Sequence, residues 1–449
     1  MLAGDTIAAI ATAPGRGGVA IVRVSGPEAF AVAARLMREE ERGKGGEGRE
    51  VRFARLFSPV SPLIPLPSSL FPPPSTLIDE CVVLFFRAPH SYTGEDVVEF
   101  QCHGGTVTPR RVLEACFAAG ARLARRGEFT QRAFLNGKLD YDQAESVLDL
   151  VDAKTDRAAD AALGGLTGRK RREDRTLYEE ALAISVELEH ALDVDEGELP
   201  AGFLPSIASR ISHLASEIGA AIRRAREGKL LREGALVVLA GPPNAGKSSL
   251  MNALLEENRA IVSDTPGTTR DSIEEWLDLE GWPVRLVDTA GLREAGDAIE
   301  AEGVKRAEDL IARADVVLAL LPHPSSLIPP SSSLIPLHAK CDLGRGEGLN
   351  VSAKTGEGLD ALKRAIVAKL EASFVAPAAS VDDRRLSVLL DVSSTLSPLI
   401  PHPSSLPSSD PVLLGNAVRS AAERLGSLVG ATYSADLLEN LFYRFCVGK

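Results

Sequence analysis

The sequence lacks the features of secreted, membrane-spanning and zinc-binding proteins. No apolar run approaches the roughly 20 residues that a helix needs to cross a bilayer, and the segment Met1–Asp5 lacks the basic stretch that begins a signal peptide. The five cysteines are scattered and odd in number, without a CxxC or Cys/His cluster. We therefore expect a cytoplasmic protein with free thiols and no stable membrane insertion.

An excess of positive charge is also missing. The net charge is −12, whereas a protein that grips nucleic acid over its whole surface is usually basic. Any contact with RNA would have to use a local patch such as residues 169–172 or 223–226. Both runs fall in helical patterns, and solvated helix faces are the better interpretation of them.

Two kinds of periodicity are present instead. In the first ~125 residues short apolar runs alternate with glycines, and this pattern predicts strands at 19–24 and 81–86 and a helix over 108–119. The mixture is typical of an α+β domain. Helical spacing follows, with an N-terminal capping box predicted at Asp140 and Gln143. Two apolar stripes at helical spacing are Ala144, Val147, Leu148 and Val151, and Leu177, Ala181, Ile184 and Leu188.

From residue 235 to about 372 the pattern changes to β/α alternation, and helical spacing returns at 417–428 and 435–445. The last helix carries the stripe Leu437, Leu438, Leu441, Phe442 and Phe445. A helical domain with a nucleotide-binding domain inserted into it explains this order. The predicted segments are an α+β domain (1–125), a first helical part (126–232), an α/β nucleotide-binding domain (233–374) and a second helical part (375–449).

Three tracts rich in proline, serine and leucine interrupt this plan, at Ser58–Ser75, Leu321–Leu337 and Leu396–Pro411. Proline at this density blocks helix and central strand alike, so we expect extended, poorly packed segments. The second tract lies where the nucleotide-binding domain needs a helix and a buried strand. Part of its sheet is therefore expected to be missing.

A phosphate-binding loop is predicted at Gly241–Ser248, which fits G-x-x-x-x-G-K-[ST] between an apolar strand pattern and a helix pattern. Backbone N–H groups and the helix N-terminus would hold phosphate oxygens. Lys247 would reach the β- and γ-phosphates, and the Ser248 hydroxyl would bind Mg²⁺. The nucleotide contacts predicted in and after the loop are Asn244, Ala245, Gly246, Lys247, Ser248 and Ser249.

Downstream motifs favour GTP over ATP. A first switch is predicted around Gly267–Asp271, with Thr269 closing on Mg²⁺ and the γ-phosphate, and a second begins at Asp288. The candidate residues in these two motifs are Pro266, Gly267, Thr268 and Thr269, and Asp288, Thr289, Ala290 and Gly291. The guanine base would be contacted by Lys340, Asp342, Ser352, Ala353 and Lys354. Ala339 stands where such proteins carry asparagine, so one contact to the base is lost.

The water-positioning glutamine of many GTPases is also absent, because Leu292 follows the Asp-x-x-Gly motif. An acid would have to position the water, and Glu294, Asp297, Glu300 and Glu302 lie close in the sequence. Neither Arg270 nor Arg293 is an obvious arginine finger. A bound monovalent cation could supply the missing charge, with the Asn244 side-chain oxygen as one ligand.

Several motifs resemble the MnmE (TrmE) family of tRNA uridine-modification GTPases over nearly the whole chain outside the three tracts. They include Pro14–Gly18, Ser91–Asp96, His103–Gly105, Gly127–Lys138 and Phe445–Lys449. The resemblance implies an N-terminal folate-binding domain, a discontinuous helical domain and an inserted Ras-like P-loop GTPase domain. It also implies a homodimer through the N-terminal domains.

Site residues follow from the same resemblance. K⁺ would be bound by Asn244, Ser263, Thr265 and Thr268, and Glu300 would help to orient the water. A 5-formyl- or methylene-tetrahydrofolate would be bound by Arg23, Glu99, Lys138 and Lys449. An active role for Cys446, beside the end of the chain, is a further hypothesis, and a packed thiol is its alternative. His103, between glycines, is interpreted as structural.

The implied reaction is modification of C5 of the wobble uridine (U34) of certain tRNAs. GTP hydrolysis stimulated by K⁺ would drive a conformational step, and the FAD-containing partner MnmG (GidA) would join in a heterotetramer. Two alternatives stay open. One is a GTPase switch in ribosome assembly, like the Era and Der groups. The other is an impaired family member, which Ala339 and the three tracts suggest.

Overall fold

The computed structural model describes residues 4–38, 45–46, 49–58, 76–192, 202–242, 244–258, 274–288, 300–320, 333–373, 384–399, 411–430 and 441–448. The chain forms two compact units, residues 1–148 with 432–449 and residues 149–431. Both α+β and α/β parts are present, as the sequence predicts. In the described ranges no helix combines the length and the apolar character that a membrane span requires.

The first unit is built on a sheet whose described strands follow the order β3-β5-β6-β7-β2-β1-β8, with β4 on β5. Only β1 and β8 pair in parallel among these strands. The strands are β1 (Ile7–Ile10), β2 (Val19–Ser25), β3 (Met37–Arg38), β4 (Gly45–Gly46), β5 (Arg49–Phe57), β6 (Leu77–Phe86), β7 (Val97–His103) and β8 (Arg122–Leu123).

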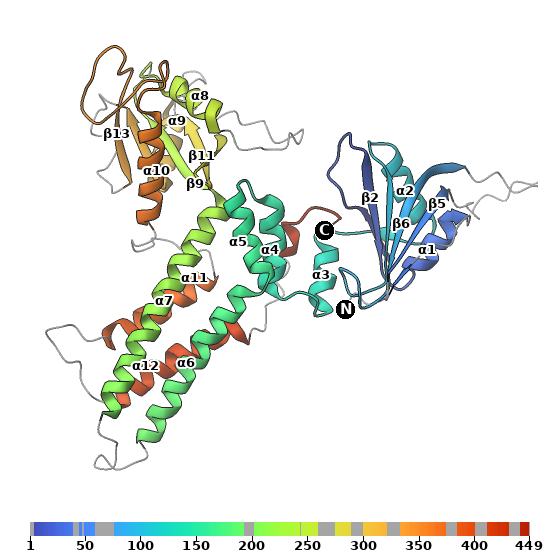
Figure 1. Cartoon of the computed structure of the whole chain (residues 1–449), viewed down its shortest axis with the longest axis horizontal. Helices are drawn as coiled ribbons and strands as arrows, with labels where there is room; N and C mark the ends of the chain where they lie inside the picture. The colour runs from blue at the N-terminus through green and yellow to red at the C-terminus, as the bar shows by residue number, and fades with distance from the viewer. Residues whose placement is uncertain are drawn as a thin grey trace, which may run out of the picture. The chain divides into compact units, whose positions relative to one another are not determined.

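Side chains alternate between the two faces of this sheet. Val22, Val83 and Phe100 point to one face, where they form a core with helices α1 (Ala29–Leu36) and α2 (Thr108–Ala118) (Figure 1). Burial of these apolar faces stabilises the unit by roughly 25 cal/mol per Å² removed from water. The strands predicted at 19–24 and 81–86 and the helix predicted over 108–119 are confirmed.

Helices α3 (Glu128–Leu135) and α4 (Tyr141–Asp152) follow the sheet. The predicted capping box is confirmed: the Asp140 N–H donates to Gln143 Oε1 at 2.9 Å, and the Gln143 N–H donates to Asp140 Oδ1 at 2.8 Å. A small core unites α4 with the end of the chain through Ala144, Leu148, Leu441, Phe442 and Phe445. The predicted stripe on α4 ends at Leu148, because Val151 is 46% exposed. Leu437 and Leu438 lie outside the described residues.

A helical bundle forms one part of the second unit. Its helices are α5 (Asp156–Leu166), α6 (Arg169–Leu192), α7 (Phe203–Glu233), α11 (Arg384–Leu396) and α12 (Pro411–Val429), with a 3₁₀ turn η1 (Ser397–Leu399) after α11. The predicted stripe Leu177, Ala181, Ile184 and Leu188 is buried in the core that α6, α7, α11 and α12 share. The two helical parts predicted on either side of the insertion therefore pack together (Figure 1).

The inserted part of the second unit has a sheet whose described strands follow the order β10-β11-β9-β12-β13-β14. All neighbours are parallel except β10 and β11. The strands are β9 (Ala235–Ala240), β10 (Glu274–Leu279), β11 (Trp282–Asp288), β12 (Val316–Leu320), β13 (Leu334–Ala339) and β14 (Leu349–Val351), and the helices are α8 (Lys247–Asn258), α9 (Glu300–Arg313) and α10 (Leu359–Ser373).

Strand β13 corrects the expectation that the second proline-rich tract would leave the sheet incomplete. The last four residues of that tract, 334–337, form the first four of the strand, which pairs in parallel with β12 and β14. Ile335 and Leu337 are buried while Pro336 is exposed. The period-2 alternation therefore outweighs the proline, whose missing N–H is the feature that normally confines it to sheet edges.

Candidate functional site

The phosphate loop lies between β9 and α8, where the motif predicts it. Strand β9 is buried along its whole length and leads into Gly241. A Cβ at Gly241 would lie 2.9 Å from Leu320 Cβ on β12, so only glycine fits there. Asn244 (φ 61°) and Gly246 (φ 97°) then bend the backbone before α8 begins at Lys247. This geometry turns the loop toward a helix N-terminus, which is a ready anion site.

Three side chains converge beside this loop. The Lys247 ammonium, 5% exposed, donates to the carbonyl oxygens of Gly241 at 3.0 Å and Pro242 at 2.9 Å. The Ser248 hydroxyl donates to Asp288 Oδ2 at 2.8 Å, from the first turn of α8 to the end of β11. A hydroxyl and a carboxylate together suit Mg²⁺, which prefers oxygen ligands. The structure therefore places the predicted phosphate lysine and the predicted magnesium residue Ser248 beside Asp288, while the other predicted magnesium residue, Thr269, lies outside the described residues.

The two loops predicted to contact the base, after β13 and β14, also meet. The Ser352 hydroxyl, which is fully buried, donates to Asp342 Oδ1 at 2.7 Å. This hydrogen bond is the main cause that holds the pKa of Asp342 below its usual range, so the carboxylate stays an acceptor for guanine N–H groups. The Lys340 ammonium donates to the Asn244 carbonyl oxygen at 3.1 Å and so ties this loop to the phosphate loop.

Ala339 ends β13 beside the phosphate loop. Its Cβ would lie 3.9 Å from a Cβ placed on Gly246. A methyl group at this point offers no hydrogen bond to a base or to the loop. Of the two contacts that such a motif makes to guanine, only the one from Asp342 is therefore expected here, and Ser352 holds that carboxylate in place.

Other predicted nucleotide and cation residues lie outside the described residues. They are Ser263, Thr265, Pro266, Gly267, Thr268, Thr269, Thr289, Ala290 and Gly291. Glu300 begins α9, but its side chain is not described, and Lys449 is also outside the described residues. Ala245 and Ser249 lie in the loop and the first turn of α8, and Ala353 and Lys354 follow β14.

Arg23 and Glu99 form a second candidate site, in the first unit. They face each other across β2 and β7, with Arg23 Nε 2.7 Å from Glu99 Oε1. The guanidinium also lies 5.4 Å from the Tyr92 ring centroid and 5.6 Å from that of Phe129. Sequence reasoning did not single out these two rings, although both stand in motifs that carry the family resemblance. Burial raises the pKa of Tyr92, so its hydroxyl stays protonated.

Lys138 contacts the loop of residues 89–93, which also contains Tyr92. Its ammonium donates to the Pro89 carbonyl oxygen at 3.0 Å, and the Asn136 side-chain amide donates to the Thr93 carbonyl oxygen at 2.8 Å. The segment 89–93 thus contacts Lys138 through Pro89 and Arg23 through Tyr92. Lys138 and Arg23 therefore contact one loop, and Glu99 joins them through its ion pair with Arg23.

The end of the chain is held against the start of α3 and the end of β1. The Arg126 guanidinium donates to the Phe445 carbonyl oxygen at 3.0 Å, and a Cβ at Gly448 would lie 2.2 Å from the Ile10 carbonyl oxygen. Cys446 is exposed in this segment, whereas the other four cysteines are buried. Burial raises the pKa of Cys81 to about 12 and of Cys102 to about 11. Cys446 is therefore the thiol that a substrate can reach.

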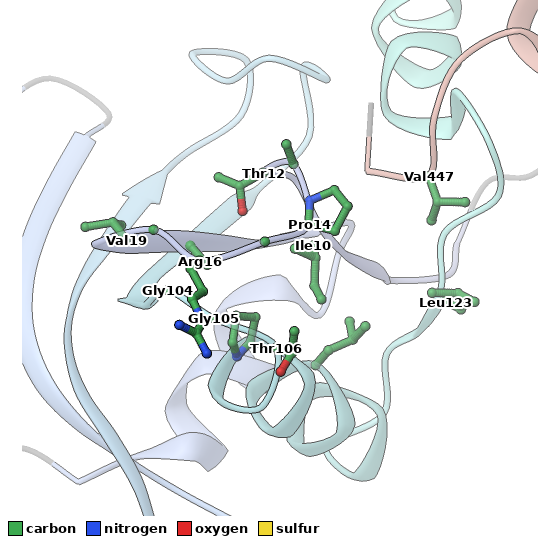
Figure 2. Close-up of a pocket in the computed structure, with 16 residues that line it drawn as sticks. Ile10, Thr12, Pro14, Arg16, Val19, Gly104, Gly105, Thr106, Leu123 and Val447 are labelled. Carbon is green, nitrogen blue, oxygen red and sulfur yellow. The ribbon is translucent and has the colours of Figure 1, made fainter. Parts of the chain in front are cut away.

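A cavity of about 570 Å³ lies elsewhere in the first unit, between two glycine-rich loops. A Cβ at Gly104 would lie 2.0 Å from the Gly17 carbonyl oxygen, so the loops pack backbone against backbone. Figure 2 shows Arg16 beside the loop of Gly104 to Thr106. Neither Arg23, Glu99 nor Lys138 lines this cavity. The family motifs Pro14–Gly18 and His103–Gly105 thus shape a space separate from the Arg23 site.

Comparisons with known proteins cover almost the whole chain. Two family models match, the N-terminus of GTP-binding protein TrmE over residues 6–138 and the MnmE helical domain over residues 142–446. Two curated relatives are named tRNA modification GTPase MnmE, one from Symbiobacterium thermophilum and one from Thermus thermophilus. Each is 40% identical over 99% of both chains. Among solved structures, the G domain of the T. maritima FeoB iron transporter is 26% identical, with a TM-score of 0.22, over 30% of this chain and 98% of that one.

Proposed function

The chain belongs to the MnmE (TrmE) family of tRNA modification GTPases, and we propose that its GTP hydrolysis serves modification of C5 of the wobble uridine, U34. The carbon would come from a 5-formyl- or methylene-tetrahydrofolate. We retain the boundaries at 125/126, 232/233 and 374/375 as the proposed domain organisation. Because the substrate is tRNA, the proposed location is the cytoplasm.

The observation that carries the folate proposal is the Arg23–Glu99 pair with its two flanking rings. A half-buried carboxylate accepts hydrogen bonds from paired N–H donors on a heterocycle edge, and a guanidinium pairs with carboxylates such as those of a folate tail. The rings of Tyr92 and Phe129 offer flat apolar surface beside these charges. Lys138 and Lys449 would add positive charge for the same tail.

A strain that lacks the gene tests the proposed reaction. We expect C5-modified wobble uridines to disappear from its tRNA and to return with the wild-type gene. With the Arg23→Ala gene they should stay below about a tenth of normal, since that variant loses the guanidinium proposed to pair with the folate. Mass spectrometry of tRNA nucleosides gives the measurement. Arg111→Ala, an exposed arginine on α2, is the matched control. Unchanged tRNA in the deletion strain would refute the proposal and favour the Era/Der-like alternative.

We also propose that Mg²⁺ binds at Ser248 and Asp288, with Thr269, and that K⁺ binds beside Asn244. Two observations support this proposal. Ser248 and Asp288 are 2.8 Å apart, and Asn244 lies in the loop that is predicted to bind the phosphates. Ser263, Thr265 and Thr268 would complete the K⁺ site, and Glu300 would orient the attacking water. Positive charge at this point would stabilise the transition state where no arginine finger is evident.

Exchanging KCl for NaCl tests the cation proposal on purified protein. At equal ionic strength we expect GTP turnover to be about 10-fold or more faster with K⁺, because a preorganised charge at the phosphates acts mainly on the transition state. The Asn244→Ala variant should lose most of this difference. Equal rates of phosphate release in the two salts would contradict a K⁺ site.

The proposed partners are a second copy of the chain, the FAD-containing MnmG (GidA) in a heterotetramer, and tRNA. Exposed apolar side chains support the homodimer. They lie on the sheet of the first unit, on the face away from α1 and α2. Val51 and Phe53 of β5 are 46% and 57% exposed there. Exposed apolar side chains gathered on one face are typical of a protein contact.

A further inference from the structure

The hairpin formed by β10 and β11 touches the helical bundle at its tip. Trp282, fully buried, shares a core with Ala158 of α5 and Leu231 of α7. The Arg157 guanidinium carbon lies 3.9 Å from the Trp282 ring centroid, which is a close cation–π contact. The Lys154 ammonium lies 5.9 Å from the Trp276 ring centroid on the neighbouring strand. Both tryptophans of the chain are therefore in this hairpin, one beside a cation of α5 and the other beside a cation just before α5.

Polar contacts also hold the β10–β11 hairpin against α5 and α7, and we call this contact region the junction. The Thr155 side chain caps α5 by accepting from the Ala158 N–H at 3.2 Å, and it donates to the Gly281 carbonyl oxygen in the hairpin turn at 2.8 Å. Arg157 also donates to Glu227 of α7 at 2.6 Å. A Cβ at Gly281 (φ 86°) would lie 3.1 Å from Arg157 Cβ, so the turn approaches α5 closely. Arg157 thus contacts the hairpin and both helices.

The other end of the hairpin is at the nucleotide site. Strand β11 ends at Asp288, which is 2.8 Å from Ser248, and β10 follows the predicted first switch in sequence. The neighbouring strand β9 connects α7, through Gly234, to the phosphate loop. Figure 1 shows α7 running directly into β9. Two adjacent strands therefore link the phosphate site to α5 and α7.

We propose that Arg157 is a positioning residue for GTP hydrolysis, because it holds the β10–β11 hairpin on α5 and α7 and so couples the nucleotide state to the bundle. Strand β11 is buried at six of its seven residues. Close-packed strands move as units and do not deform locally. A shift of Asp288 between nucleotide states would therefore change the contact at Trp282, six residues away. Conversely, a loosened tip would misplace Asp288 at the magnesium site.

Intrinsic tryptophan fluorescence tests this proposal, since both tryptophans report on the junction. In the wild-type chain we expect different emission with GDP and with a non-hydrolysable GTP analogue, each at saturation with Mg²⁺. In Arg157→Ala this difference should fall by at least half, and kcat should fall by about 10-fold. The Kd for fluorescently labelled GTP should change by less than about twofold, because the phosphate loop is untouched.

Arg157→Lys keeps a cation over the ring and should recover part of the emission difference, which a purely structural loss would not show. Arg175→Ala removes an exposed arginine that pairs with Glu179 on its own helix, α6, and should match the wild type. If Arg157→Ala does not fold, Arg157→Lys and Glu227→Gln take its place in the same measurement. Equal wild-type spectra with the two nucleotides, or an undiminished difference in the variants, would overturn the proposal.

Discussion

Replacing Lys247 with alanine is expected to lower kcat for GTP by about 10²–10³-fold, which is the usual effect of removing one preorganised charged donor from a transition state. The Lys247 ammonium is nearly buried and is held by the carbonyl oxygens of Gly241 and Pro242. It is therefore already placed at the loop where the β- and γ-phosphates would lie. Alanine removes this charge and leaves the loop backbone free to turn as before.

Phosphate release under saturating GTP and Mg²⁺ measures the effect of Lys247→Ala. Lys369→Ala, on α10, is the control and should keep wild-type turnover, because none of the predicted phosphate or base residues lies on α10. Circular dichroism and thermal unfolding of both variants separate a chemical loss from a folding loss. A Lys247→Ala protein that is folded and retains more than a tenth of the wild-type kcat would contradict the assignment of the phosphate site.

The second large effect is expected from Glu128→Gln, in the first unit. Glu128 is fully buried, and its carboxylate accepts from the Arg122 guanidinium at 2.5 Å and 2.9 Å, from the Arg125 N–H at 2.8 Å and from Arg132 at 3.1 Å. Arg132 is 5% exposed. Arg122 and Arg132 both keep Asp5 as a partner, and Arg132 also keeps Glu95. The lost carboxylate charge at the buried centre of the network is therefore expected to cost about 3 kcal/mol, the lower end for breaking a buried ion pair.

Hydrogen exchange of the α3 amides measures this loss, since both tryptophans belong to the other unit. Glu114→Gln is the matched control. Glu114 is 61% exposed and lies 3.8 Å from Arg110 on the same helix, so the change should cost less than about 0.5 kcal/mol. Equal protection of α3 in the two variants would show that the buried network contributes little.

The effect of Glu128→Gln depends on pH. Burial by itself would raise the pKa of Glu128, but the hydrogen bonds from Arg122, the Arg125 N–H and Arg132 outweigh it and lower the pKa from 4.5 to about 2. A carboxyl whose folded pKa is lowered contributes its full stability above the unfolded pKa. The difference between wild type and variant should therefore be constant above about pH 5 and shrink as pH falls from 4.5 toward 2.

Prediction from sequence worked best where the signal is contiguous. The phosphate loop, the Asp140–Gln143 capping box and the stripe on α6 each depend on residues a few positions apart, so local geometry decides them. The proline-rich tract at 321–337 shows the limit. Composition predicts a poorly packed segment there, yet residues 334–337 form the first part of β13, because pairing with β12 and β14 buries Ile335 and Leu337.

The amino-acid sequence alone therefore indicated the class of nucleotide, the position of the phosphate loop between a strand and a helix, and the family. The tertiary structure decided which distant side chains meet. Arg23 reaches Glu99 through strand register, Glu128 meets Arg122 and Arg132 in a buried network, and Arg157 meets Trp282 across 125 positions of sequence. Such pairs depend on how strands align and helices pack, and a short-range pattern carries no information about either.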